Sequence, residues 1–322
     1  MTDDLLKRLL ALPEPGDYPA WLRAKRRQFR RLLGEFPNRD PVQARVEDRQ
    51  IEDDHIVERV VYETEPGEQV PAIILVPRHR EPPFPAVVCL HQHAGQWELG
   101  KSEVVGHAGN PEQAYAKELC YRGYVTIAPD ALGFEERRDA SRPGEEQERL
   151  EATRLLLQGS TLMGKMVWDA TRALDYLETR PEVDRNRIGC IGHSMGGYVT
   201  WAAMAADSRI QVGVSSCGIS TFAAIMREKI IHSLVLLIPG LLKWGDVPEV
   251  IATLAPRPFL IVSAQEDRLF PRDGIEEVHW RAHQLYSRLG AADRLGLFLA
   301  PGPHAFTADM RAWAYQWFDR WL

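Results

Sequence analysis

Short apolar runs alternate with amphipathic segments along most of this 322-residue chain. The runs are typical of strands buried on both faces, and the segments between them repeat hydrophobic residues at helical spacing. This alternation predicts a mostly parallel sheet with helices on both faces. The predicted strands are 60–64, 72–76, 86–90, 124–128, 188–191, 212–216, 259–263 and 295–299, and the predicted helices are 21–33, 111–121, 165–178, 195–206, 274–288 and 307–322.

The first 40 residues and two internal segments depart from this alternation. Residues 1–40 are predicted to be a helical extension, with Leu5, Leu6, Leu9 and Leu10 on one face. Residues 137–151 are charged and predict an exposed excursion, whereas residues 221–250 form an apolar, helix-like insertion between two strands. The insertion is a candidate lid, and a helix that merely packs on the sheet is equally favoured. With no internal repeat or linker, residues 1–322 are expected to form a single domain.

Composition narrows the function classes. Hydrophobic content of 45% and charged content of 26% are typical of a globular protein. The net charge of −6 and the lack of a dense basic patch argue against nucleic-acid binding. No apolar run has signal-peptide or membrane-spanning length, so a cytoplasmic protein without a membrane partner is expected. The four cysteines form no CxxC or other metal-ligand spacing, and three of them sit in or beside strand-like runs, as small buried hydrophobes do.

One pentapeptide carries the strongest chemical signal. The predicted strand 188–191 leads directly into Gly192-His193-Ser194-Met195-Gly196, and a helix-forming segment follows. Strand, sharp turn with a serine, and helix are the order that a nucleophile elbow requires. The two glycines leave room where backbones approach closely, and the helix that starts behind Ser194 directs free N–H groups toward a developing negative charge.

A serine nucleophile needs a base, and the base needs an acid that orients it. Asp267 follows the predicted strand 259–263, with Glu266 as the fallback and a helix-capping role as the plainer interpretation. His304 follows the predicted strand 295–299 in a Pro/Gly loop. The order Ser194, Asp267, His304 matches the order of catalytic residues in hydrolases that carry this elbow.

Hydrolysis also needs donors for the oxyanion. The backbone N–H of Met195 is one predicted donor. The second is expected from the loop after strand 86–90, with the N–H of His93 preferred and that of Gln92 next. His91 and His93 also raise the alternative of a metal site, but no third ligand is suitably spaced, so no metal is expected.

Four motifs stand at or after strand ends: Leu90-His91-Gln92-His93-Ala94-Gly95, Asp130-Ala131-Leu132-Gly133, Gly192-His193-Ser194-Met195-Gly196-Gly197 and Gly302-Pro303-His304-Ala305-Phe306. Together they resemble the α/β-hydrolase superfamily, and most closely its dienelactone hydrolase-like and acetyl xylan esterase-like branch. The resemblance covers residues 55–322 and implies an eight-stranded, mostly parallel sheet, a Ser-His-Asp triad and no cofactor. The sequence departs from the pattern by carrying serine where dienelactone hydrolases use cysteine, and Gln92 where many relatives have glycine.

These observations predict a serine carboxylesterase that hydrolyses short-chain esters of small molecules or saccharides. His304 would take the proton of Ser194, and Asp267 would orient the imidazole. Asp130 is expected to be structural. Acetyl esters of sugars enter only through the resemblance, because a fold does not determine a substrate. A prolyl-oligopeptidase-type peptidase and a non-catalytic binding module are the alternatives. The acyl group, the alcohol and the oligomeric state are not determined by the sequence.

Overall fold

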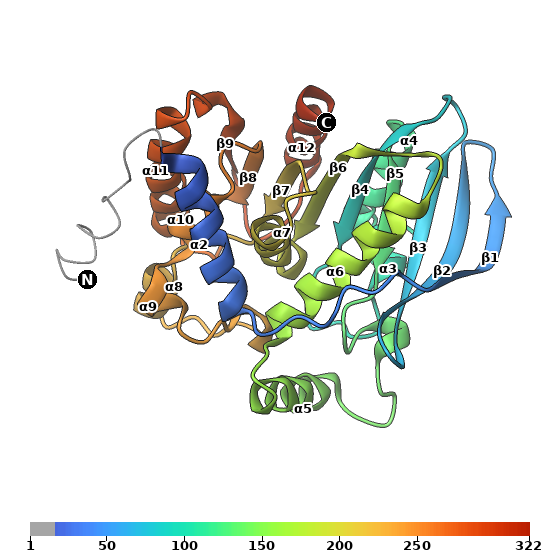
Figure 1. Ribbon diagram of the computed structural model, residues 1–322, viewed down its shortest axis with the longest axis horizontal. Coiled ribbons are helices and arrows are strands. Elements are labelled where there is room, and N and C mark those ends of the chain that lie inside the picture. The colour runs from blue at the N-terminus through green and yellow to red at the C-terminus, as the bar shows by residue number, and fades with distance from the viewer. Residues whose placement is uncertain (1–16) are drawn as a thin grey trace.

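The computed structural model describes residues 17–322 and contains one nine-stranded sheet (Figure 1). The strand order is β1-β2-β3-β5-β4-β6-β7-β8-β9, in which β1, β2 and β3 pair antiparallel and all pairs from β5 to β9 are parallel. The mostly parallel sheet is therefore as predicted. The strands are β1 (Ala44–Ile51), β2 (His55–Glu65), β3 (Glu68–Pro77), β4 (Phe84–Leu90), β5 (Val125–Pro129), β6 (Val183–His193), β7 (Val212–Ser216), β8 (Phe259–Ala264) and β9 (Leu295–Ala300).

Helices cover both faces of the sheet (Figure 1). Helices α6 and α7 pack on one face, with α2, α10 and α11 beside them, and α4 and α12 pack on the other. The helices are α2 (Tyr18–Leu32), α3 (Lys101–Val104), α4 (Tyr115–Tyr121), α5 (Gly144–Leu157), α6 (Leu162–Thr179), α7 (Met195–Ala206), α8 (Phe222–Arg227), α9 (Leu241–Trp244), α10 (Val247–Thr253), α11 (Arg272–Arg288) and α12 (Ala308–Trp321). None of these helices combines the length and the hydrophobicity needed to span a membrane.

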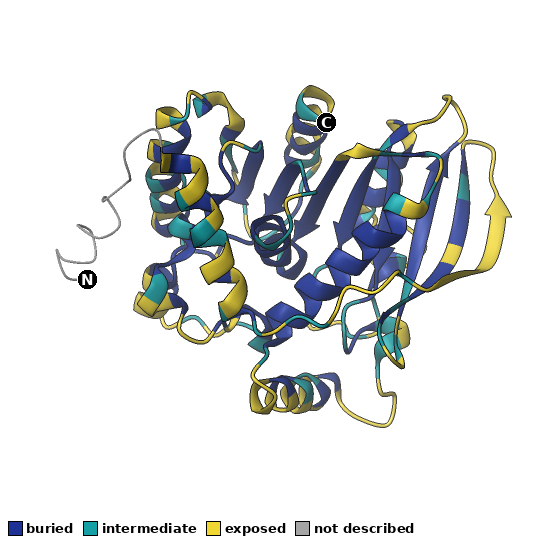
Figure 2. Cartoon of the chain, viewed as in Figure 1, coloured by how far each residue is buried: buried dark blue, intermediate teal, exposed yellow. Residues whose placement is uncertain are grey.

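The central strands separate two hydrophobic cores. In β4, Val87 and Cys89 face the core under α4 and α12, whereas Val88 and Leu90 face the core under α6 and α7. This alternation follows from the period of two along a strand. Figure 2 shows the result: the central strands and α7 are buried, and the edge strand β1 is exposed.

Strand β1 brings the sheet to nine strands, one more than the resemblance implied. All eight of its residues are exposed, and half of them are charged, so no apolar run marks it in the sequence. Backbone pairing with β2 forms the strand, with a bulge between Val46 and Asp48. A charged, bulged edge is a common protection against pairing with other chains.

Three predicted segments have further outcomes. The segment 137–151, predicted to be an exposed excursion, is mostly exposed, and its second half forms the first part of α5. The 221–250 insertion consists of α8, the 3₁₀ turn η4 (Leu234–Leu236), α9 and the start of α10. Of the helical extension, α2 is observed, while the predicted face of Leu5, Leu6, Leu9 and Leu10 lies outside the described residues.

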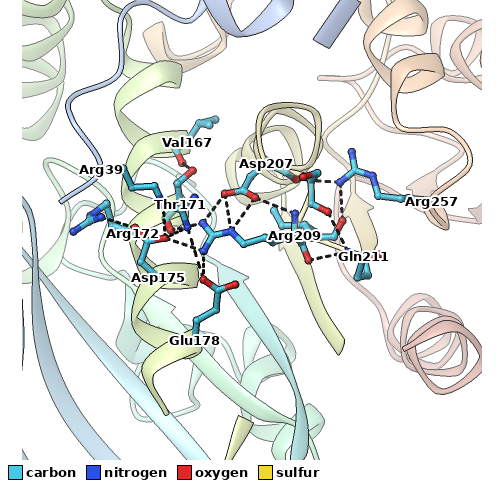
Figure 3. A network of polar contacts seen from close by, with 12 residues as sticks. Arg39, Val167, Thr171, Arg172, Asp175, Glu178, Asp207, Arg209, Gln211 and Arg257 are labelled. Carbon is cyan, nitrogen blue, oxygen red and sulfur yellow. Dashed lines mark hydrogen bonds and ion pairs between the residues drawn. The ribbon is translucent and has the colours of Figure 1, made fainter. Parts of the chain in front are cut away.

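An ionic network holds the end of α7 that lies far from Ser194 (Figure 3). Arg209 forms ion pairs with Asp207 at 2.6 Å and with Glu178 of α6 at 2.7 Å. Partly buried Arg257 donates to the carbonyl of Asp207 at 3.0 Å and to that of Ile210 at 2.7 Å. Because the last carbonyls of a helix lack partners within it, Arg257 caps α7 through the carbonyl of Met204, whereas Arg209 connects the end of α7 to α6.

Candidate active site

Ser194 occupies a strained turn between β6 and α7. Its φ of +53° and ψ of −114° lie in a region that non-glycine residues rarely adopt, and its N–H donates to the carbonyl of Ser216 at 2.8 Å. A Cβ on Gly196 would lie 1.8 Å from the carbonyl oxygen of Leu90, and one on Gly192 would lie 2.2 Å from the backbone of Gly196. Glycine at both positions is therefore required by close backbone approach.

The sheet topology places this turn beside the loop after β4. Strands β4 and β6 are parallel neighbours, and Leu90 pairs with Gly192 at their carboxyl ends. After β4 the chain continues to β5 on one side of the sheet, whereas β6 leads to β7, β8 and β9 on the other. Ligand sites of open α/β sheets lie at such a switch point.

His304 and Asp267 form a hydrogen-bonded pair. Nδ1 of His304 lies 2.8 Å from Oδ2 of Asp267, whose side chain is fully buried. The other oxygen, Oδ1, accepts the backbone N–H groups of Leu269 and Phe270 at 2.8 and 3.2 Å. The neighbouring Glu266 is exposed, and the structure thus joins His304 to Asp267 and not to the fallback.

Two aromatic rings hold the imidazole of His304. Phe270 stacks on it with a centroid distance of 6.0 Å, and the ring of His193 lies at 5.0 Å. Burial and the nearby His304 lower the pKa of His193 well below its ordinary value, so His193 is neutral. Its Nδ1 lies 3.0 Å from Oγ of Ser216. These contacts restrict the orientation of the imidazole that faces the pocket.

Ser194 and His304 line one pocket of about 610 Å³. The loop after β4 contributes Gln92 and His93, the two candidates for the second oxyanion donor. Met195, the other predicted donor, is the buried first residue of α7, directly after Ser194, and is not among the residues that line this pocket. The remaining lining residues come from the same loop after β4, from α5, from α7, from the insertion and from the loop after Asp267. They are Ala94, Gly95, Trp97, Glu145, Glu148, Arg149, Tyr198, Ile231, His232, Ser233, Leu234 and Leu269.

The ring of His91 fixes the loop after β4 through two hydrogen bonds. Its Nδ1 donates to the carbonyl of Gln92 at 2.7 Å, and its Nε2 accepts the N–H of Ala131 at 3.0 Å. Burial lowers the pKa of His91 to about 4, which keeps it in the neutral form that both hydrogen bonds require. The other histidine considered as a metal ligand, His93, has a different partner: its Nε2 lies 2.6 Å from Oε2 of Glu148.

One acidic cluster near the pocket has the composition of a cation site, and a lysine fills it. Asp130, Glu135 and Glu136 bring their carboxylates within reach of one another, and the Lys101 ammonium lies 2.6 to 2.7 Å from each. Asp130 also accepts the backbone N–H of Lys101 at 2.9 Å. Asp130 therefore has a structural role, as the sequence suggested. It holds Lys101, which in turn forms ion pairs with Glu135 and Glu136.

One part of the pocket wall was not predicted, and a second part was predicted only as a candidate lid. Helix α5 carries Glu148 and Arg149, and the sequence offered no clear sign of them because the buried residues of α5 include Gly144 and Gln147 and form no apolar stripe. Residues 231–234 lie in the predicted insertion, but their place beside Ser194 depends on contacts far along the chain.

Comparisons with known proteins agree with this architecture. The model of the Abhydrolase family matches residues 11–275. YtaP of Bacillus subtilis (strain 168), whose name assigns it to the hydrolases without a substrate, is 34% identical over 308 residues, or 94% of this chain and all of YtaP. Carbohydrate esterase MZ0003, from an unknown prokaryotic organism, is 27% identical over 167 residues, covering 42% of this chain and 39% of that protein.

A solved structure shows the same fold. The glucuronoyl esterase from Solibacter usitatus superposes with a TM-score of 0.71 at 15% identity and covers 94% of this chain and 93% of its own. Identity this low supports the fold alone. Together with the family match, the likeness confirms the fold class predicted from the sequence.

Proposed function

Because this chain belongs to the abhydrolase family of α/β-hydrolases, we propose that it is a serine esterase in which Ser194, His304 and Asp267 form the catalytic triad. One observation carries the proposal. The strained serine shares a pocket with an imidazole that is hydrogen-bonded to a fully buried carboxylate. A strained turn that exposes a serine hydroxyl is typical of a nucleophile when a base lies in the same pocket.

We assign a role to each group of the proposed triad on the basis of this geometry. With its Nδ1 proton engaged by Asp267, His304 keeps Nε2 free to take the proton of Ser194 as the Oγ atom attacks an ester carbonyl. The backbone N–H groups of Met195 and His93 would stabilise the oxyanion of the tetrahedral intermediate. The alcohol then leaves with a proton from His304. Water attacks the resulting acyl-enzyme by the same route and releases the acid.

The pocket supports an ester with a hydrogen-bonding alcohol. Gln92, Glu145 and Arg149 present polar groups beside the apolar ring of Trp97, a combination that suits a polar ligand with a defined orientation. Short-chain esters, with acetyl esters of sugars among them, are therefore the proposed substrates. The name of the carbohydrate esterase relative supports the same class.

Ester turnover tests the proposal. The S194A variant should lose at least about 10⁴-fold in kcat toward 4-nitrophenyl acetate, and a fluorophosphonate should label the wild type but not the variant. Acetate, butyrate and octanoate esters, measured beside acetylated xylan, would define the acyl and alcohol preference. Wild-type turnover by S194A would contradict the proposal. Faster cleavage of an aminoacyl 4-nitroanilide than of any ester would favour a peptidase, and a failure of the probe to label would favour a binding module.

A further inference from the structure

A carboxylate outside the proposed triad joins two walls of the pocket. Glu148 on α5 uses both of its oxygens. Oε2 lies 2.6 Å from Nε2 of His93, and Oε1 accepts the backbone N–H of Leu234 at 2.7 Å. The side chains of Glu148 and His93 are only 13% and 17% exposed, so both contacts are shielded from most of the solvent, which strengthens them.

The first contact fixes the loop after β4. The N–H of Gly95 donates to Nδ1 of His93 at 3.0 Å, which leaves the ring proton on Nε2, where it is donated to Glu148. The rings of Trp97 and Phe134 pack edge-on against His93 at centroid distances of 5.2 and 5.1 Å. The imidazole is thus held on several sides, and its backbone N–H, the proposed second oxyanion donor, is held with it.

The second contact fixes the segment 231–234 of the insertion. Two further hydrogen bonds hold this segment: Ser233 with the hydroxyl of Tyr198 on α7 at 2.8 Å, and Nε2 of His232 with the carbonyl of Leu269 at 2.9 Å. Its three anchors therefore lie on α5, on the helix that follows Ser194 and on the loop that follows Asp267. The segment 231–234 is therefore a fixed wall of the pocket.

We propose that Glu148 is a positioning residue that holds the His93 loop and the 231–234 wall in register around Ser194. The inference rests on the proposed esterase function and deepens it. Oxyanion donors act only when they are placed in advance, since a displacement of about 1 Å can cost two orders of magnitude in rate. Glu148 would contribute by keeping the His93 amide in place before substrate binds.

The number of N–H donors that Glu148 accepts provides a specific test of the proposal. Two N–H groups, from His93 and Leu234, point at Glu148, and an ionised carboxylate accepts both. A glutamine has one acceptor oxygen, and its NH₂ group would face the second N–H. E148Q therefore keeps the shape of the side chain but cannot accept both N–H groups, so the His93 loop is no longer connected to the 231–234 wall and loses its fixed position.

Steady-state kinetics of the full chain with 4-nitrophenyl acetate test this role. E148Q should lower kcat at least about tenfold with less than a threefold change in KM, because an oxyanion contact acts in the transition state. Y198F, which releases the wall at another anchor, should raise KM and leave kcat near the wild-type value. E146Q is the matched control, since it removes the same charge from an exposed position of the same helix. It should behave as the wild type.

A second variant guards against misfolding. H93F keeps an aromatic ring against Trp97 and Phe134 but removes both ring nitrogens, so it should reproduce the loss of kcat. The double variant E148Q/H93F should be no worse than either single variant, because both act through one contact. Additive losses would overturn the proposal.

The same assay separates this inference from the proposed function. If S194A is inactive and E148Q keeps the wild-type kcat, or changes only KM, the positioning role of Glu148 is overturned and the esterase proposal stands. If S194A keeps full turnover, both are overturned.

Discussion

His304 donates a hydrogen bond from Nδ1 to Oδ2 of Asp267 across 2.8 Å, and no part of the Asp267 side chain reaches solvent. The two residues follow neighbouring parallel strands, β8 and β9, whose carboxyl ends bring them together. The backbone N–H groups of Leu269 and Phe270 hold the other carboxylate oxygen. The pair therefore has one defined geometry, and its consequences can be tested.

Replacing Asp267 by asparagine should abolish most of the activity. The amide would present an N–H toward Nδ1 of His304 and favour the wrong tautomer, so kcat should fall by about 10³- to 10⁴-fold with KM nearly unchanged. Steady-state hydrolysis of 4-nitrophenyl acetate provides the measurement. The exposed neighbour offers a control, since E266Q should retain wild-type kinetics. A large loss in E266Q with an active D267N would reverse the assignment of the acid.

An alanine at Gly196 should disrupt the turn that carries Ser194. Its Cβ would lie 1.8 Å from the carbonyl oxygen of Leu90, so the backbone of β4 or α7 must move, and the free energy of unfolding should fall by about 3 kcal/mol or more. Gly290 is the comparison, because it has a positive φ but open space around its Cβ position. G290A should therefore cost only about 1 kcal/mol. Denaturant unfolding measures both, and equal costs would contradict the steric argument.

Removal of the Lys101 ammonium should destabilise the fold. K101M leaves Asp130, Glu135 and Glu136 facing one another, and breaking a buried ion pair from one side costs about 3 to 5 kcal/mol. Burial raises the pKa of Asp130 to about 6 against the opposing effect of Lys101, so without Lys101 it should rise further. When the pKa of a carboxyl is higher in the folded than in the unfolded state, the free energy of unfolding falls as the pH rises. K101M should therefore be less stable at pH 8 than at pH 5, and the opposite trend would refute this interpretation.

The fold should lose stability in acid through His91. Burial lowers its pKa from 6.5 to about 4, so between these values the unfolded chain binds more protons than the folded protein, and the free energy of unfolding decreases as the pH falls. The full effect is roughly 3 kcal/mol at 1.36 kcal/mol per pKa unit. In H91Q, which can keep a donor and an acceptor, the loss of stability between pH 7 and pH 4.5 should be smaller by about 2 kcal/mol. An unchanged loss in urea titrations would show that His91 does not contribute. His193 acts in the same direction, and it is present in both proteins.

Buried elements and the order of the proposed triad could be predicted because local patterns report burial. The eight apolar strands, α6 and the turn at Ser194 are visible as runs, helical periods and a glycine pair. Strand β1 and helix α5 were missed because their residues are largely exposed and show no clear apolar pattern. Their formation depends on partners: β1 pairs with β2, and α5 contributes Glu148 to contacts with His93 and Leu234.

The sequence by itself determined the class of sheet, the position of the strained serine and the residues that follow each strand end. Only the tertiary structure decided which of them meet. In the folded protein Asp267 is buried and Glu266 is exposed, and Glu148 contacts His93, which lies 55 residues away along the chain. Hydrophobic periodicity encodes whether a residue is buried. Which polar groups pair depends on how distant strands and helices are aligned, and this alignment exists only once the sheet has formed.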